Sequence, residues 1–421
     1  MNRVIIGILC VIVLTQSLID LELDVQLGGW YANAPIVDIA GLLLCVVVCI
    51  DLYRSHKAQV HYPQSPPLPG RNGYLMFLAV CLISLTTSFV PGESLHFIAR
   101  KPVFLFVAYG WALPLIVSRL PGSALVTKPL MVWMGATSSL SILTSASRWM
   151  AGGGLWFASI SGITPNHKSL AVSIAGALPL ILVLLTKEYR KAHPSRFKWG
   201  VLVTSLALLA IVLSFSKTAW ITTAVAIGLF VPRKRPWSLR PMWLATGLVM
   251  AMALAYYAPL LSGSRTMLDA ARSRHSLNRR AEMMVREHPL VGYGAGTNTV
   301  YEMVTFPHYR VNGIDAHGVV QKVVSETGIV GLVGFGWFSM ATGAALRRRW
   351  TSRLEPNATP GWFDLPAPHD LTSAATATWI TLHVNLLLST ETFSPTHWVP
   401  LGICWGLAHR PSNELSGDRT S

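Results

Sequence analysis

The sequence is divided into about twelve hydrophobic segments joined by mostly short polar loops, and this pattern restricts the fold more than any other feature. A helix needs roughly 20 mostly apolar residues to cross the hydrocarbon core of a bilayer, and most of the segments approach that length. The segments span residues 3–19, 35–52, 73–90, 102–118, 126–146, 169–186, 199–215, 218–232, 241–261, 318–345, 372–390 and 396–408. Only 13% of the residues are charged, whereas about a quarter are charged in soluble domains. We therefore expect an all-α polytopic membrane protein with about twelve transmembrane helices, folded as a single domain over residues 1–421.

The positive charge of the chain is concentrated in alternate loops between these segments. The basic residues of those loops are Arg54, Lys57 and Arg71; Lys187, Arg190, Lys191, Arg196 and Lys198; Arg233, Lys234, Arg235 and Arg240; and Arg347, Arg348, Arg349 and Arg353. Short cytoplasmic loops of membrane proteins are rich in lysine and arginine, whereas outer loops are poor in them. The alternation predicts that both termini are cytoplasmic and that residues 262–317 form a loop on the outer side. The net charge of +15 is then explained by topology, and it does not indicate a nucleic-acid partner.

The outer loop over residues 262–317 departs from this pattern, because it contains seven arginines and no lysine. A guanidinium group grips phosphate oxygens two at a time, so a group of arginines here predicts a phosphate-bearing ligand. Arg265 and Arg274 have few acidic neighbours in the sequence, which makes them candidates for that contact. A role without a ligand stays open for both residues.

A short amphipathic helix is predicted inside this loop, ending before Pro289. Its apolar residues recur at helical spacing and are Leu277, Ala281, Met284 and Val285. The arginines on its other faces are Arg279, Arg280 and Arg286. Pairing with Glu282, Glu287 or anionic lipid headgroups is the first interpretation of these arginines, and a supporting contact to the ligand is the second. The glycine-rich run over residues 292–296 predicts a tight turn, since no strand precedes it as in a nucleotide-binding loop.

Four further residues on the predicted outer side carry polar groups suited to a ligand or to catalysis. Lys217 lies in a tight turn between two segments, where its ammonium group either meets a substrate or extends to the membrane interface. His317 ends the outer loop, and its imidazole can act as a general base toward a hydroxyl or hydrogen-bond into the loop. His167 and Lys168 begin another segment, where helix capping and interface anchoring are the alternatives to substrate contact.

Some candidate groups lie inside the predicted membrane segments. Glu326 is deep in the segment 318–345, and an intramembrane carboxylate is a candidate functional group. Lys322 precedes it by four residues on a similar helix face, so an internal ion pair is the competing interpretation. The five cysteines all fall inside predicted helices, which indicates neither a disulfide framework nor a zinc site.

Four short elements share a consistent order and the same predicted side of the membrane. They are Asn166-His167-Lys168-Ser169-Leu170-Ala171, Ser216-Lys217-Thr218-Ala219-Trp220, Arg286-Glu287-His288-Pro289-Leu290-Val291-Gly292-Tyr293-Gly294-Ala295-Gly296, and Asp315-Ala316-His317 followed by Ser325-Glu326-Thr327-Gly328-Ile329-Val330-Gly331-Leu332. Together they resemble the signatures of the bacterial O-antigen ligase and O-antigen polymerase superfamily, across residues 145–345. Two positions depart from the family pattern: Lys217 stands where arginine is usual, and Gly318 stands where asparagine is common.

The resemblance implies a glycosyltransferase that works on the periplasmic side of the bacterial inner membrane, in contact with membrane lipids. Members take a glycan from undecaprenyl pyrophosphate and transfer it, with inversion, to a sugar hydroxyl. The acceptor is lipid A–core in ligases and another lipid-linked repeat in polymerases. By motif, His317 is the expected base, and Arg265 or Arg274 with Lys217 are the expected pyrophosphate contacts. The supporting candidates are Arg279, Arg280, His167, Lys168 and Glu326. We expect neither a metal nor a cofactor, because these cations can neutralise the departing pyrophosphate.

We favour O-antigen ligase among the functions compatible with this sequence. An O-antigen or exopolysaccharide polymerase using the same donor is the alternative from the same superfamily. A transporter or flippase for a lipid-linked or anionic substrate is the alternative from a different class. Transporters are expected to show repeats, broken helices and midplane charges. Here no repeat is visible, and polar residues gather on the predicted outer face, apart from Lys322 and Glu326.

Overall fold

The computed structural model describes most of the predicted hydrophobic segments and part of the loops. The described residues are 2–16, 22–27, 30–57, 69–120, 124–150, 167–185, 190, 194–214, 216–230, 277–298, 318–351, 371–388 and 393–408. Four helices in this part of the chain are long and apolar enough to cross a membrane: Ile36–Arg54, Pro91–Arg119, Pro194–Leu213 and Val319–Arg348. These helices support the predicted membrane protein, while the total of about twelve transmembrane helices stays a prediction.

Helices dominate the described residues. They are α1 (Asn2–Thr15), α2 (Ile36–Lys57), α3 (Arg71–Ile83), α4 (Pro91–Ile98), α5 (Leu113–Arg119), α6 (Ala124–Met150), α7 (His167–Leu182), α9 (Pro194–Leu213), α10 (Lys217–Phe230), α14 (Val319–Thr351), α15 (Leu371–Leu388) and α16 (Pro395–Ala408). Every hydrophobic segment predicted from the sequence overlaps a helix, except residues 241–261, which lie outside the described residues. The helical architecture is thus confirmed as far as the structure describes it.

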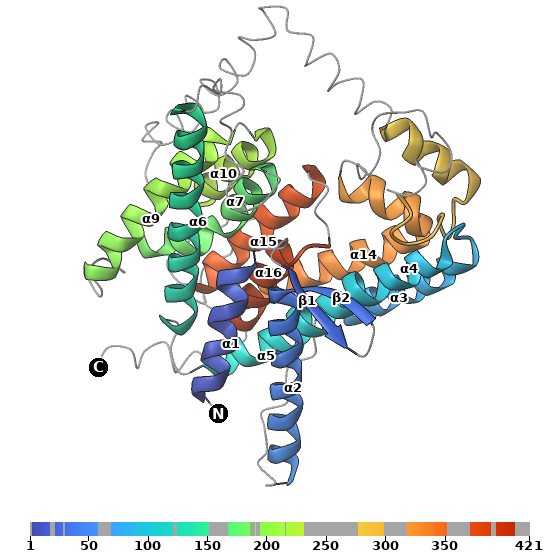
Figure 1. The fold of residues 1–421 in the computed structure, drawn as a ribbon, viewed down its shortest axis with the longest axis horizontal. Coiled ribbons are helices and arrows are strands. Elements are labelled where there is room, and N and C mark those ends of the chain that lie inside the picture. The colour runs from blue at the N-terminus through green and yellow to red at the C-terminus, as the bar shows by residue number, and fades with distance from the viewer. Residues whose placement is uncertain are drawn as a thin grey trace, which may run out of the picture.

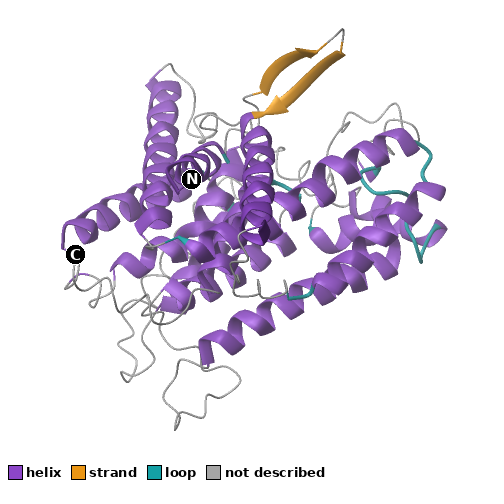
Figure 2. Cartoon of the chain, turned by 90° about the horizontal axis from the view of Figure 1, so that it is seen from below, coloured by secondary structure: helices purple, strands orange, loops and turns teal. Residues whose placement is uncertain are grey.

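A two-stranded hairpin is an addition to the expected all-α fold. Strand β1 (Glu22–Leu27) pairs antiparallel with β2 (Trp30–Pro35), with Leu27 opposite Trp30. Figure 2 shows the hairpin projecting beyond the helices. Hydropathy indicated only a loop here, because two strands of this length do not form a hydrophobic run of membrane-spanning size.

Helices α15 and α16 lie in the middle of the molecule, between two groups of helices (Figure 1). Helices α6, α7, α9 and α10 form one group, and α3, α4 and α14 lie on the other side. Helix α15 contacts α7 and α10 from the first group and α14 from the second. Segments that are far apart in the sequence therefore meet along α15.

Helices α3 and α14 pack closely because glycines remove side chains from their interface. A Cβ on Gly73 would lie 2.7 Å from the backbone nitrogen of Phe338, and a Cβ on Gly334 would lie 2.9 Å from that of Phe77. Small residues let the backbones of membrane helices approach where no hydrophobic effect drives their association. This contact fixes α14 against α3.

Two π-helical segments widen the helix between α4 and α5: η2 (Ala99–Val103) and η3 (Phe106–Ala112). The carbonyl of Pro102 accepts a hydrogen bond from the Tyr74 hydroxyl at 2.9 Å. The Tyr74 ring also stacks on Phe106, with ring centroids 4.2 Å apart. The wider π-helical turn thus gives α3 both a hydrogen bond and an aromatic contact with this helix.

Candidate functional site

Helix α14 is interrupted at Gly328, whose backbone angles of φ 66° and ψ −171° are not helical. The sequence predicted one uninterrupted helix over residues 318–345, and this prediction was wrong at the break. Hydropathy does not detect the interruption, because the residues on both sides belong to one apolar run. A break leaves carbonyl groups unpaired at the end of the first half and N–H groups unpaired at the start of the second.

The loop that follows Pro289 fills the break and satisfies these groups. Four backbone hydrogen bonds join the loop to α14, two on each side of Gly328. They run from the Tyr293 N–H to the Ser325 carbonyl (3.0 Å), from Gly294 to Glu326 (3.0 Å), from Ile329 to Pro289 (2.9 Å) and from Val330 to Leu290 (3.3 Å). The loop therefore caps the end of the first half of α14 and the start of the second half.

Glycine is required on both sides of this contact. Gly292 has a φ of 73°, and a Cβ there would lie 2.3 Å from the carbonyl carbon of Glu326. Gly328 has a φ of 66°, and a Cβ there would lie 2.2 Å from the carbonyl carbon of Leu290. Only glycine adopts such backbone angles without a steric cost. The predicted tight turn is confirmed, and the structure shows that it docks against the break in α14.

A network of buried polar side chains lies beside the break. The side-chain oxygen Oδ1 of Asn298 accepts a hydrogen bond from Nη2 of Arg280 at 2.6 Å, and its Nδ2 donates to Oγ of Ser325 at 2.8 Å. The backbone N–H of Asn298 donates to Oε1 of Glu326 at 3.3 Å, and Nζ of Lys322 lies 3.6 Å from the same oxygen. The ion pair that competed with a functional role for Glu326 is thus present. Arg280, Lys322 and Glu326 are only 4%, 5% and 2% exposed, respectively.

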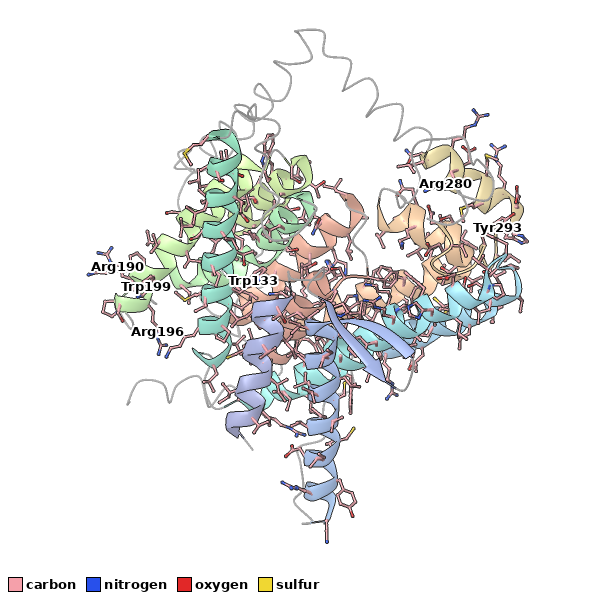
Figure 3. The ribbon with its side chains drawn as sticks, in the orientation of Figure 1. Trp133, Arg190, Arg196, Trp199, Arg280 and Tyr293 are labelled. Carbon is pink, nitrogen blue, oxygen red and sulfur yellow. The ribbon has the colours of Figure 1, made fainter. Side chains whose placement is uncertain are left out.

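The predicted amphipathic helix is confirmed over residues 277–287 and is called the loop helix below. Its buried apolar residues are Leu277, Ala281 and Met284. Arg279 is exposed, and Arg286 forms an exposed ion pair with Glu282 at 2.5 Å. Figure 3 shows Arg280, from the loop helix, in the same corner of the molecule as Tyr293 of the docked turn. The loop helix thus presents exposed charges on one face and a buried arginine on another.

Lys217 is the first residue of α10, in the tight turn predicted from the sequence. Ser216 precedes it as a helix cap, because its Oγ accepts a hydrogen bond from the Ala219 N–H at 3.4 Å. The Trp220 indole N–H donates to the Ile211 carbonyl at 2.9 Å and ties α10 to α9. Local capping and this cross-helix bond together fix the backbone position of Lys217.

Helices α10 and α14 begin beside the same end of α15. The hydroxyl of Thr218 donates a hydrogen bond to the Leu388 carbonyl at 3.4 Å. Gly318, just before α14, lies against Leu387, the residue before Leu388. A Cβ on Gly318 would be 3.0 Å from the carbonyl oxygen of Leu387. Lys217 precedes Thr218 in the sequence, and His317 precedes Gly318. The segments that carry these two candidates therefore meet at the end of α15.

The other predicted candidates fall into separate groups. Those outside the described residues are His317, Arg265 and Arg274. Those that begin helices, but whose side chains are not described, are His167, Lys168 and Lys217. The structure brings Arg280 and Glu326 into one network. Arg279 is exposed on the loop helix, and none of the described hydrogen bonds of this network involves it. Asn298, at the centre of that network, was missed, because a single asparagine in a loop carries no signal in hydropathy or spacing.

The described polar groups of the site are ammonium, guanidinium, amide, hydroxyl and carboxylate groups. Among the residues that the structure describes, no three histidine, cysteine or carboxylate side chains are grouped as metal ligands would be. The chemistry that the described groups offer is charge neutralisation and hydrogen bonding. In the network beside the break, these groups are buried and pair with one another.

A comparison with known protein families finds a match in the central part of the chain. Residues 202–336 match the sequence model of a family described as O-antigen ligase. The matched stretch contains the turn at Lys217, the whole loop over residues 262–317 and the break at Gly328. A search of curated proteins finds no match to this chain.

Proposed function

We propose that this chain, whose residues 202–336 match the O-antigen ligase family, is an O-antigen ligase. In this proposal it moves a glycan from undecaprenyl pyrophosphate to a sugar hydroxyl of lipid A–core. The reaction takes place on the periplasmic face of the bacterial inner membrane. Residues 1–421 form one membrane domain, and residues 262–317 form its periplasmic loop.

The proposed reaction is a direct displacement at the anomeric carbon of the donor sugar. His317 accepts the proton of the acceptor hydroxyl, whose oxygen forms a bond to the anomeric carbon. The bond from that carbon to the pyrophosphate oxygen breaks, and the electron pair leaves with undecaprenyl pyrophosphate. One displacement inverts the configuration. Arg265, Arg274 and Lys217 neutralise the charge that grows on the leaving group, so the proposal needs no metal or cofactor.

The meeting of α10 and α14 at the end of α15 is the observation that carries this proposal. Thr218 and Gly318 lie within one hydrogen bond or van der Waals contact of Leu388 and Leu387, respectively. A leaving-group contact at Lys217 and a base at His317 need this proximity, because both act on the same bond of the donor. The two segments are about a hundred residues apart in the sequence and belong to different elements of the family resemblance.

The position of Lys217 at the start of a helix adds physical support. The N-terminus of a helix carries partial positive charge from its unpaired N–H groups. A lysine there is unfavourable by itself, since it adds like charge to the dipole, whereas an anion bound at that point relieves both charges. A pyrophosphate group beside α10 is such an anion.

The proposed topology agrees with the distribution of basic residues in the fold. Arg190 and Arg196, which belong to a predicted cytoplasmic loop, lie at the opposite side of the molecule from Arg280 (Figure 3). This separation is the one expected if the loop helix faces the periplasm and the basic loops face the cytoplasm. Cytoplasmic positions for both termini follow from the same assignment.

The broken helix α14 bears on the transporter alternative, since discontinuous helices line the substrate sites of many transporters. In those proteins the break leaves backbone groups available for ions or substrate. Here the break at Gly328 is filled by the turn over residues 289–294, which makes four backbone hydrogen bonds across it. The filled break therefore favours a structural role and supports the transferase over the transporter.

The test is a transfer assay with purified protein, undecaprenyl-pyrophosphate-linked glycan and rough lipopolysaccharide, with and without EDTA. The proposal predicts glycan on lipid A–core at the same rate under both conditions. Glycan that lengthens on its own lipid carrier instead identifies a polymerase. Loss of transfer on chelation contradicts the metal-independent mechanism. If no product forms with the correct substrates supplied, the transporter becomes the favoured function.

A further inference from the structure

We propose that Asn298 is a positioning residue, which locks the loop helix onto the first half of α14. The lock holds the arginine-bearing loop and the segment that follows His317 in one fixed arrangement. Its catalytic consequence rests on the proposed transferase function, whereas the lock itself is a property of the fold. Asn298 has no place in the motifs that indicate the reaction.

The contacts of Asn298 reach both the loop helix and the first half of α14. Oδ1 accepts from Arg280 of the loop helix, and Nδ2 donates to Ser325 of α14. The backbone N–H of Asn298 adds a third bond, to the carboxylate of Glu326. Asn298 therefore joins the loop helix, which precedes it in the sequence, to α14, which follows it.

The orientation of the Asn298 amide is determined by its partners. A guanidinium group is only a donor, so the atom facing Arg280 must be the amide oxygen. The Ser325 hydroxyl donates its own proton to the Lys322 carbonyl at 3.1 Å, so it accepts from the amide nitrogen. Asn298 is fully buried, and a buried amide is stable only when its groups are paired in this way. Reversing or removing the amide breaks the side-chain hydrogen bonds to Arg280 and to Ser325.

The Asn298 network is one of the contacts that position the first half of α14, beside the burial of Val319 and Val323 in the core. This half-helix comprises only residues 319–327, which is too short to be placed by spanning the membrane. It is also separated from the long second half by the non-helical Gly328. Its described contacts with the loop are the bonds across the break and the Asn298 network. His317 precedes this segment by two residues in the sequence, so in this proposal the anchor also affects the proposed base.

Arg280 connects the loop helix to Asn298. Its side chain is 4% exposed, and the loop helix that carries it follows the loop segment with Arg265 and Arg274. In this proposal, the bond from Arg280 to Asn298 couples the loop helix, which follows the proposed phosphate contacts in the sequence, to the half-helix that follows the proposed base. A misplacement of about 1 Å between such groups can cost about 100-fold in rate, because transfer needs aligned reacting atoms.

The test compares Asn298→Ala and Asn298→Asp with the control Asn278→Ala. Asn278 has the same side chain but is exposed on the loop helix. Asn298→Asp keeps the volume and the acceptor for Arg280, but it loses the donor to Ser325 and puts a carboxylate beside Glu326. Two readouts are taken from each full-length variant: kcat and KM for transfer, and the distribution of distances between spin labels at residues 286 and 320. Both label sites are exposed, with Val320 41% exposed and the Arg286 side chain 76% exposed, and non-natural amino acids leave the native cysteines in place.

We expect kcat to fall about 100-fold in both Asn298 variants, with a much smaller change in the donor KM and a broader distance distribution. Asn278→Ala should match the wild type in both readouts. A distribution as narrow as in the wild type overturns the lock, whatever the activity. A broad distribution with unchanged kcat overturns the positioning role. If the wild type transfers glycan to no acceptor, the proposed function fails, and the label distances still decide the lock. If the Asn298 variants do not fold, Ser325→Ala removes one of the three bonds of Asn298, together with the local bond from Ser325 to the Lys322 carbonyl, and the same two readouts decide.

Discussion

Replacing Gly328 with alanine should undock the turn that fills the break in α14. The added Cβ would lie 2.2 Å from the backbone of Leu290. Because the clash is with backbone atoms, no side-chain rotation can relieve it. The angles of φ 66° and ψ −171° belong to a region that only glycine occupies readily, at a strain cost of about 2 kcal/mol for alanine. Separating the clashing backbones also breaks the adjacent bonds from Ile329 and Val330, at about 1 kcal/mol each. The free energy of undocking should therefore fall by about 4 kcal/mol, which makes the undocked state about 1000-fold more populated.

Amide hydrogen exchange measures this population directly, because the four bonds across the break protect their N–H groups. Peptides covering residues 289–294 and 325–330 should exchange about 1000-fold faster in Gly328→Ala than in the wild type. The matched control is Gly336→Ala on the same helix, where a Cβ meets nothing within 4 Å. Alanine favours a helix over glycine, so the control should exchange no faster than the wild type. Exchange in Gly328→Ala within threefold of the control would refute the steric argument.

Three further changes test the proposed chemistry and the buried ion pair. His317→Ala should abolish glycan transfer while membrane insertion stays normal; an active variant contradicts the general-base role. Arg265→Ala and Arg274→Ala should each raise the donor KM or lower kcat at least tenfold in the transfer assay, and two fully active variants contradict the phosphate contacts. Lys322→Met should destabilise the protein by about 3–5 kcal/mol in thermal or denaturant unfolding, because it leaves the carboxylate of Glu326 buried without its cation. Adding Glu326→Gln to Lys322→Met should restore part of that loss, and an additive loss contradicts the pairing.

The helices could be predicted from the sequence because the signal for them is local. A hydrophobic run of membrane length favours a helix whatever its neighbours are, since a backbone in lipid must satisfy its own hydrogen bonds. The spacing of Leu277, Ala281 and Met284 likewise predicted the loop helix and its buried face. The four-residue separation of Lys322 and Glu326 indicated their ion pair, because residues at this spacing share a helix face.

The candidate site could be predicted only as a set of chemical types. Motifs singled out Lys217, Glu326 and the loop arginines, but no local pattern relates the start of α10 to the start of α14. That relation arises because both helices reach the end of α15, which lies late in the chain. Asn298 carries no local signal either, since its importance comes from partners on two other segments.

The sequence by itself determined the membrane class, the positions of the hydrophobic helices and the chemical groups offered to a ligand, because each depends on residues close together in the chain. Only the tertiary structure decided that α14 is two half-helices, that the glycine-rich turn fills the gap between them, and that Asn298 ties the loop to the first half. The physical reason is that hydropathy measures the transfer of side chains into lipid. The break at Gly328 is instead stabilised by backbone hydrogen bonds to Pro289, Leu290 and their neighbours, more than thirty residues earlier in the chain.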